Sequence, residues 1–191
     1  MIVANVRSIR PNSDNMNFEE LLANTRLMTE YRDACLLCLS ETWLCEEIGD
    51  QCVAIDGFGT PYRTDRDNRI SEKKWGGGVG LYVNERWCSR ANITVRKQLN
   101  TRDVDLLCVS LRPRYLPREF GQIFVTVIYS PPQANAARAA TQIADVVREL
   151  QLASPDAPNF IAGDFNNTNL RTCLPALKQY VTVPTRNDKT I

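Results

Sequence analysis

Apolar residues recur along this chain in short, nearly continuous runs. Residues 35–40 read Cys-Leu-Leu-Cys-Leu-Ser, and residues 105–111 and 123–129 are also mostly apolar. Continuous apolar runs of this length are typical of β-strands whose two faces are both covered. The pattern therefore predicts strands at these three segments, further strands at residues 2–5, 77–83 and 159–162, and a weaker one at residues 93–99.

Two longer segments have helical spacing instead. A helix is expected from Asn17 to about residue 31, with Asn17 as N-cap and Glu20 completing a capping box. Apolar residues between 135 and 151 also recur at helical intervals, and Pro155 and Pro158 end that segment. Residues 174–180 indicate one more short helix. Several strands separate the helices, which predicts a layered α/β arrangement with mixed sheets.

Length and composition are consistent with one domain without a membrane span. The chain has 191 residues, 43% of them hydrophobic, which is enough for a single sizeable core. No apolar run approaches the roughly 20 residues that a membrane helix needs, and the N-terminus lacks the pattern of a secretory signal. The seven cysteines are an odd number scattered through strand-like runs. We expect free thiols and an intracellular protein.

The absence of histidine is the strongest restriction on chemistry. With no His in the chain, Ser-His-Asp and Cys-His catalysis, His-ligated zinc and an imidazole general base are all excluded within it. Any catalysis would have to use carboxylates, amides, tyrosine and a hard metal ion.

Polar groups follow three of the expected strands. Asn5 ends the first, Glu41 follows the strand at 35–40, and Asp164 with Asn166 follows the strand at 159–162. Sites in layered α/β folds form where strands end, because the strands hold the side chains while the loops leave space for a ligand. Carboxylate and amide oxygens suit Mg²⁺. Taken singly, each residue could equally be a solvated strand end or a helix cap.

Charge is unevenly distributed although the net charge is only +1. Residues 60–120 contain 13 Lys and Arg against 7 Asp and Glu. Within them, a polar connection flanked by Tyr62 and Trp75 is a candidate DNA-backbone contact or else an ordinary solvated loop. Its basic residues are Arg63, Arg66, Arg69, Lys73 and Lys74.

Two other motifs have simpler explanations. Cys35, Cys38, Cys45 and Cys52 could be drawn as a metal-binding quartet, but packed thiols account for them better. The glycine run at residues 76–80 lacks the Lys-Ser/Thr of a phosphate-binding loop and opens a strand. Close backbone packing is its favoured interpretation.

Five sequence blocks occur together in one order. They are Ala-Asn-Val-Arg-Ser at residues 4–8, Ser-Glu-Thr-Trp-Leu at 40–44, Gly-Gly-Gly-Val-Gly-Leu-Tyr-Val at 76–83, Val-Ile-Tyr-Ser-Pro-Pro at 127–132 and Gly-Asp-Phe-Asn at 163–166. On these blocks the whole chain resembles the endonuclease/exonuclease/phosphatase superfamily. Within it, the chain is most similar to the apurinic-type endonuclease domain of non-LTR (LINE-type) retrotransposons.

The resemblance implies a fold and a set of roles. The fold would be a layered α/β sandwich similar to deoxyribonuclease I, with two mixed β-sheets flanked by helices. The activity would be Mg²⁺-dependent nicking of double-stranded DNA, with Mn²⁺ as a possible substitute. Glu41 and Asn5 would hold the metal, and Asp164 would orient or deprotonate the attacking water. The phosphate would contact Asn166, Tyr129 and Thr185.

The resemblance also implies something beyond residue 191. The family pattern continues with an Asp on a further strand and then a Ser-Asp-His block, so residues 1–191 are expected to form one domain without its C-terminal strands and to have impaired activity. A reverse transcriptase domain would be the expected neighbour, and the nucleus the expected location. The rival hypotheses are an inactive remnant that binds DNA or protein, and a phosphatase or phospholipid diesterase of the same superfamily.

Overall fold

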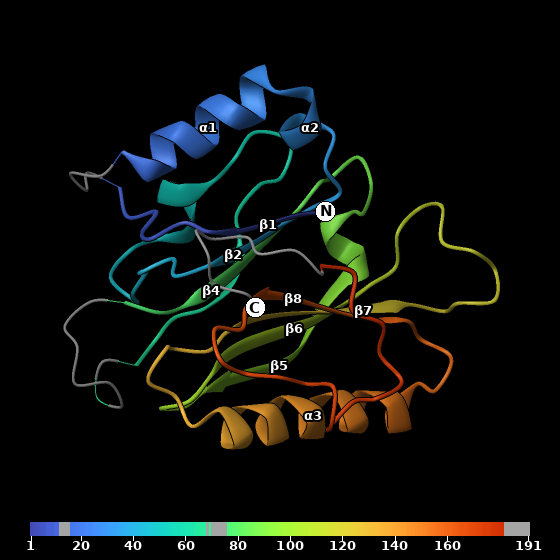
Figure 1. Cartoon of the computed structure of the whole chain (residues 1–191). Coiled ribbons are helices and arrows are strands. Elements are labelled where there is room, and N and C mark those ends of the chain that lie inside the picture. Colours follow the sequence, from blue (N-terminus) through green and yellow to red (C-terminus); the bar gives the residue numbers. More distant parts are fainter. Residues whose placement is uncertain (12–15, 68, 70–75, 182–191) are drawn as a thin grey trace.

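Two four-stranded mixed β-sheets form the centre of the molecule (Figure 1). The computed structural model describes residues 1–11, 16–67, 69 and 76–181. The first sheet has the order β1 (Ile2–Asn5), β2 (Leu36–Ser40), β4 (Val79–Val83), β3 (Tyr62–Thr64), and the second has β5 (Ile93–Asn100), β6 (Asp105–Leu111), β7 (Ile123–Tyr129), β8 (Asn159–Asp164). The pairs β1–β2 and β7–β8 are parallel, and the other neighbours are antiparallel.

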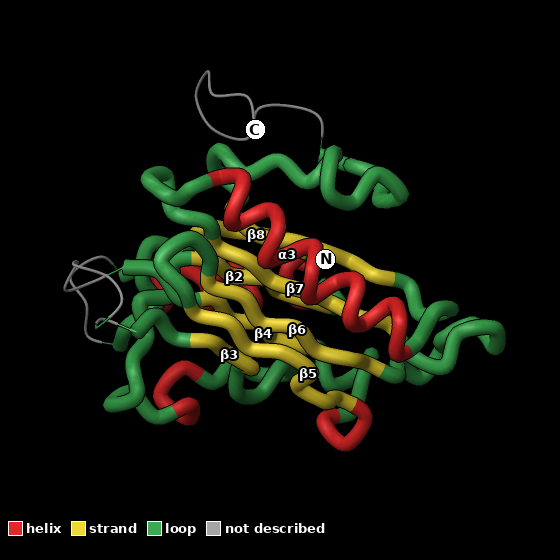
Figure 2. The backbone as a smooth tube through the Cα atoms, turned by 90° about the horizontal axis from the view of Figure 1, so that it is seen from below, coloured by secondary structure: helices red, strands yellow, loops and turns green. Residues whose placement is uncertain are grey.

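Helices cover the outer face of each sheet, so the predicted layered α/β fold is confirmed. On the first sheet lie α1 (Asn17–Leu27) and the short α2 (Thr29–Arg32). The long α3 (Ala136–Ala153) crosses the outer face of the second sheet (Figure 2). Two short 3₁₀ turns, Asp50–Val53 and Arg90–Asn92, complete the described elements. None of the described helices has the length and apolar character that crossing a membrane requires.

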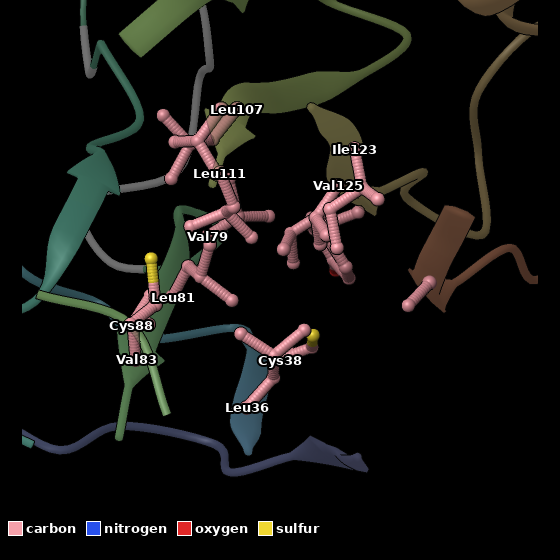
Figure 3. Packing of buried hydrophobic residues seen from close by; sticks show 14 residues of the cluster. Leu36, Cys38, Val79, Leu81, Val83, Cys88, Leu107, Leu111, Ile123 and Val125 are labelled. Atoms are coloured by element: carbon pink, nitrogen blue, oxygen red, sulfur yellow. The ribbon is translucent and has the colours of Figure 1, made fainter. Parts of the chain in front are cut away.

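Both faces of the central strands are buried, which explains their continuous apolar runs. Successive side chains of a strand point to opposite faces. In β2, Cys38 packs between the two sheets while Leu37 and Leu39 pack towards α1; in β6, Leu107 packs between the sheets and Leu106 towards α3. Figure 3 shows the layer between the sheets, filled by side chains that include Leu36, Cys38, Val79, Leu81, Leu107, Leu111 and Val125.

Several local predictions were wrong. Asn17 is not the N-cap of α1: Met16 occupies that place without a side-chain cap, and the Asn17 amide donates to the carbonyls of Val6 and Arg7. The expected single helix is divided at Met28, whose backbone is extended. Residues 174–180 form one turn followed by irregular backbone instead of a helix. The segment predicted as a polar connection contains β3, which is too short for its sequence to show alternation.

The cysteines are not paired with one another, and two glycines of the run pack closely against neighbouring segments. All seven cysteines are free thiols. Within the described residues no three His, Cys, Asp or Glu side chains gather to hold a metal, so there is no cysteine quartet. Gly77 and Gly78 have positive φ angles of +73° and +80°, and a Cβ on either would collide with side chains of neighbouring segments. These glycines therefore serve close backbone packing.

A buried ion pair joins the two sheets. Asp105, at the start of β6, is fully buried and lies 3.2 Å from Nε of Arg66, which follows β3. The Gly78 N–H and the Asn100 amide also donate to its carboxylate, at 2.9 and 3.0 Å. Burial raises the pKa of the Asp105 carboxyl to about 6, because it outweighs the opposing effects of the Arg66 guanidinium and the Gly78 hydrogen bond. The ion pair therefore costs desolvation energy while it fixes the segment after β3 against the second sheet.

Gly163 provides a test of the packing at the end of β8. Its φ of +136° is a conformation that L side chains rarely adopt, and a Cβ there would overlap the carbonyl oxygen of Ile128 on β7. We predict that Gly163→Ala lowers the free energy of unfolding by about 2 kcal/mol or more. Gly121 has open space around its Cβ position, so Gly121→Ala should stay within about 0.5 kcal/mol of wild type. Urea unfolding of both variants checks this, and equal losses would contradict it.

Asp105 should make stability depend on pH in a defined direction. A carboxyl whose pKa is about 6 when folded and 3.8 in its ordinary state favours the folded state below pH 4, and this contribution is lost as the pH rises through 6. Asp105→Asn removes the titration. We expect the stability of wild type relative to Asp105→Asn to fall by about 2 kcal/mol between pH 4 and pH 7. Urea unfolding at several pH values measures it; a difference that is constant or rises with pH would refute it.

Candidate active site

Four strands from the two sheets end at one edge of the sandwich. In the first sheet, Asn5 is the last residue of β1 and Glu41 directly follows β2. In the second, Tyr129 ends β7 and Asp164 ends β8. Asn5 is in register with Ser40, and Tyr129 with Asp164. Because each pair is parallel, these side chains emerge at the same end of their sheets.

The Asn5 amide links the two sheets at this edge. Its Nδ2 donates one hydrogen bond to Oε1 of Glu41 and another to Oδ2 of Asp164, both at 2.7 Å. The first bond lies within the first sheet, and the second crosses to the second sheet. The convergence expected from the strand ends is therefore present in the structure for Asn5, Glu41 and Asp164.

The backbone around this cluster is strained. The loops after β1 and β2 run side by side, with Ser8 N–H donating to the Glu41 carbonyl at 2.8 Å and Ile9 N–H to the Thr42 carbonyl at 3.0 Å. Within the described residues, six non-glycine positions have positive φ, and all except Met16 lie in the loops that carry the cluster. They are Arg7, Ser8, Glu41, Trp43 and Asn166. Such strain concentrates at functional sites, where the surrounding structure enforces it.

Tyr129 forms a wall of the site as a neutral phenol. It is 7% exposed and hydrogen-bonded to the Glu41 carboxylate. Burial first and the Glu41 carboxylate second raise the pKa of its phenol above the ordinary value, against the effect of Arg66. The Arg66 guanidinium lies 5.7 Å from the centre of the Tyr129 ring. At neutral pH the phenol is therefore a hydrogen-bond donor.

Asn166 is joined to the site by hydrogen bonds to Asp164 and Ser130. Its backbone N–H donates to Oδ1 of Asp164 at 3.1 Å, and its side-chain amide donates to the Ser130 carbonyl at 2.8 Å. These bonds fix the loop after β8 against the end of β7 and orient the Asp164 carboxylate. A phosphate contact would use the second N–H of the same amide.

The donor atoms of the cluster fit a hard divalent cation. Two carboxylates and an amide are oxygen donors of the kind that Mg²⁺ binds, usually with one or two protein carboxylates and several waters. The Asn5 NH₂ group stands between the two carboxylates, so a hydrogen-bond donor takes the position that a cation would favour. Rotation of the amide by 180° would give up the 3.3 Å hydrogen bond that Oδ1 accepts from the Arg7 N–H and would present Oδ1 to a cation instead.

The predicted basic contacts are mostly engaged within the protein. The Arg63 side chain is 15% exposed and pairs with Asp50 at 3.0 Å and Asp65 at 3.5 Å. Arg66 is 7% exposed and is held by Asp105, which differs from the solvent-facing loop that we expected. Arg69 is 90% exposed and pairs with Asp67 at 2.8 Å. Lys73, Lys74 and Thr185 lie outside the described residues.

Sequence reasoning did not predict the Arg66–Asp105 ion pair that lies beside Tyr129. The Arg66–Asp105 pair places a guanidinium beside the ring, and neither residue belongs to the sequence blocks that identify the site. One signal was present: Asp105 is a carboxylate at the first position of a strand that is otherwise almost wholly apolar. A charge in such a place requires a partner, because an unpaired buried charge is very costly.

Comparison with known proteins yields structural relatives only. No profile of a known protein family matches the sequence, and no curated protein is significantly similar to it. The endonuclease domain of TRAS1, a telomere-specific non-LTR retrotransposon, matches with a TM-score of 0.54 and 14% identity, covering 91% of this chain and 70% of that one. An endonuclease/exonuclease/phosphatase family protein from Bacteroides thetaiotaomicron matches with a TM-score of 0.52 and 13% identity, covering 86% of this chain and 62% of that one. The chain therefore has the two-sheet layered fold of the endonuclease/exonuclease/phosphatase proteins.

Proposed function

We propose that the chain is a Mg²⁺-dependent phosphodiester hydrolase that nicks double-stranded DNA, of the kind found in non-LTR retrotransposons. The observation that supports it most directly is the joining of Glu41 and Asp164, from different sheets, through the Asn5 amide. A structural relative of the same fold is a retrotransposon endonuclease domain. The sequence blocks that carry the resemblance include all three residues.

Each side chain has a role that its surroundings permit. Glu41 and the Asn5 amide oxygen would hold the metal ion, which supplies charge neutralisation at the phosphate when bound. Asp164, oriented by the Asn166 N–H, accepts a proton from the attacking water or aligns that water. The Tyr129 phenol would turn its single O–H from Glu41 to a phosphate oxygen, and its raised pKa keeps the proton in place at neutral pH.

Histidine has no part in this mechanism, because the chain has none. Proton transfer within residues 1–191 is therefore assigned to Asp164 and to water. A general acid or base commonly contributes on the order of 10² to 10⁴ in rate.

A nicking assay tests the proposed hydrolysis. We expect the chain to convert supercoiled plasmid to the open circle in Mg²⁺, and Glu41→Gln or Asp164→Asn to lower the rate by about 10² or more. Glu47→Gln, an exposed neighbour in the same loop, is the matched control and should retain the wild-type rate. Wild-type activity in EDTA, or equal rates for all four proteins, would contradict the proposal.

Metal binding can be measured without any activity. A divalent ion that binds only the folded state stabilises it by about 2.7 kcal/mol at a hundredfold excess over its dissociation constant. We therefore expect Mg²⁺ and Mn²⁺ to raise the Tm of wild type and of Glu47→Gln, but not that of Glu41→Gln. Metal-dependent stabilisation without nicking would favour an inactive remnant. Stabilisation that survives Glu41→Gln would place the metal elsewhere.

A further inference from the structure

Most cationic side chains in the basic middle of the chain already have partners. Between residues 60 and 120, guanidinium or ammonium groups are engaged at Arg63, Arg66, Arg69, Arg86, Arg90, Arg96 and Lys97. Within the part of the chain that the structure describes, the cationic side chains without a hydrogen-bond or ion-pair partner in this span are Arg102, Arg112, Arg114 and Arg118. Three of these four lie in one loop, so the charge excess seen in the sequence is concentrated there.

This basic loop, residues 112–119, connects β6 to β7 and reads Arg-Pro-Arg-Tyr-Leu-Pro-Arg-Glu. In Figure 1 it belongs to the yellow connection that projects from the body of the molecule beside β7. Its three arginines are exposed, and Tyr115 between them is 88% exposed. Packing of the hydrophobic core does not explain why an aromatic ring is exposed to water among unpaired cations.

The backbone beneath these side chains is anchored. Arg112 N–H donates to the Asn92 carbonyl at 3.0 Å, and Arg114 N–H to the Trp87 carbonyl at 3.1 Å. Pro113 is buried, and Leu116 packs against the core between the sheets. The exposed side chains are thus presented from fixed positions, which lowers the conformational entropy lost on binding.

The basic loop is remote from the candidate active site. It follows the C-terminal end of β6, whereas Asp105 and the neighbouring Tyr129 lie at the other end of the paired strands. Seven residues of strand span about 20 Å. Beside the loop is a hollow of about 270 Å³ lined by Arg112, Gln122 and residues 154–157. A ligand here would not compete for the Asn5–Glu41–Asp164 cluster.

We propose that the basic loop binds single-stranded nucleic acid. Arginine guanidinium groups pair with phosphates, and an exposed tyrosine ring stacks on an unpaired base, whatever its identity. A duplex keeps its bases stacked on one another, so Tyr115 would have no base to contact along it. An acidic peptide would satisfy the arginines but would leave the ring unused. The proposal does not rest on the proposed hydrolysis.

Fluorescence anisotropy with labelled (dT)₁₂ tests the proposal in EDTA, where the candidate metal site plays no part. The full chain should bind, and the triple variant Arg112→Gln, Arg114→Gln, Arg118→Gln should bind about tenfold more weakly at 50 mM NaCl, with a slope of log K against log[NaCl] reduced by about 2. The matched control is Arg26→Gln, Arg32→Gln, Arg148→Gln, which removes three exposed cations elsewhere. It should change the affinity less than twofold.

Substitutions of Tyr115 test the role of the aromatic ring separately from that of the arginine charges. Tyr115→Ala should weaken (dT)₁₂ binding about fivefold or more, Tyr115→Phe should retain it because the ring remains, and the exposed Tyr180→Ala should have no effect. Tyr115→Ala should leave binding to a 12-base-pair duplex unchanged, and Glu41→Gln should leave (dT)₁₂ binding unchanged. The proposal is overturned if Tyr115→Ala binds (dT)₁₂ as tightly as wild type, or if a labelled poly-glutamate peptide binds as tightly as (dT)₁₂. If the wild-type chain binds (dT)₁₂ but does not nick plasmid, the result contradicts the proposed hydrolysis and leaves the proposed binding standing.

Discussion

Face-to-face packing of the two sheets is the constraint on which the rest of the structure depends. The layer between them contains residues from β2, β4, β6 and β7, and helices bury the outer faces. With both faces covered, neither sheet can shift relative to the other without opening the core. The parallel strands β1 and β8, each at an edge of its sheet, are thereby held so that Asn5 and Asp164 meet. A short polar side chain can bridge two sheets only because packing fixes both strand ends.

The strained loops and the buried ion pair at this edge lower the free energy of unfolding, and burial of the hydrophobic core compensates for that loss. Backbone strain at Glu41 and Asn166 and the desolvation of the Arg66–Asp105 pair each oppose folding. What they share is that they orient side chains. The strained loops orient the carboxylates, and the ion pair holds a guanidinium beside Tyr129. Such costs are expected where geometry is needed for binding or chemistry.

The sequence predicted the layers and the converging strand ends because both follow from local pattern. Apolar runs mark doubly covered strands, and a polar residue at the end of each run marks the shared edge. It could not predict contacts made by residues far apart in the chain. Asn17 looked like a helix cap because only its local context is visible in sequence, whereas in the structure its amide is used by the loop after β1. Likewise, β3 is recognisable only through its pairing with β4.

The distribution of charge was predicted in outline and misplaced in detail. A sequence count treats every arginine alike, but an arginine that is paired with a carboxylate offers little to a phosphate. Arg63, Arg66 and Arg69 each have such a partner, so the segment with the densest basic sequence among the described residues is largely neutralised. The edge that carries the candidate site presents the carboxylates of Glu41 and Asp164, joined by a neutral amide. Two carboxylates repel other anions, so this edge by itself does not attract a polyanion. Attraction of a polyanion would therefore depend on cations elsewhere on the surface, and the exposed arginines of the basic loop are cations of that kind.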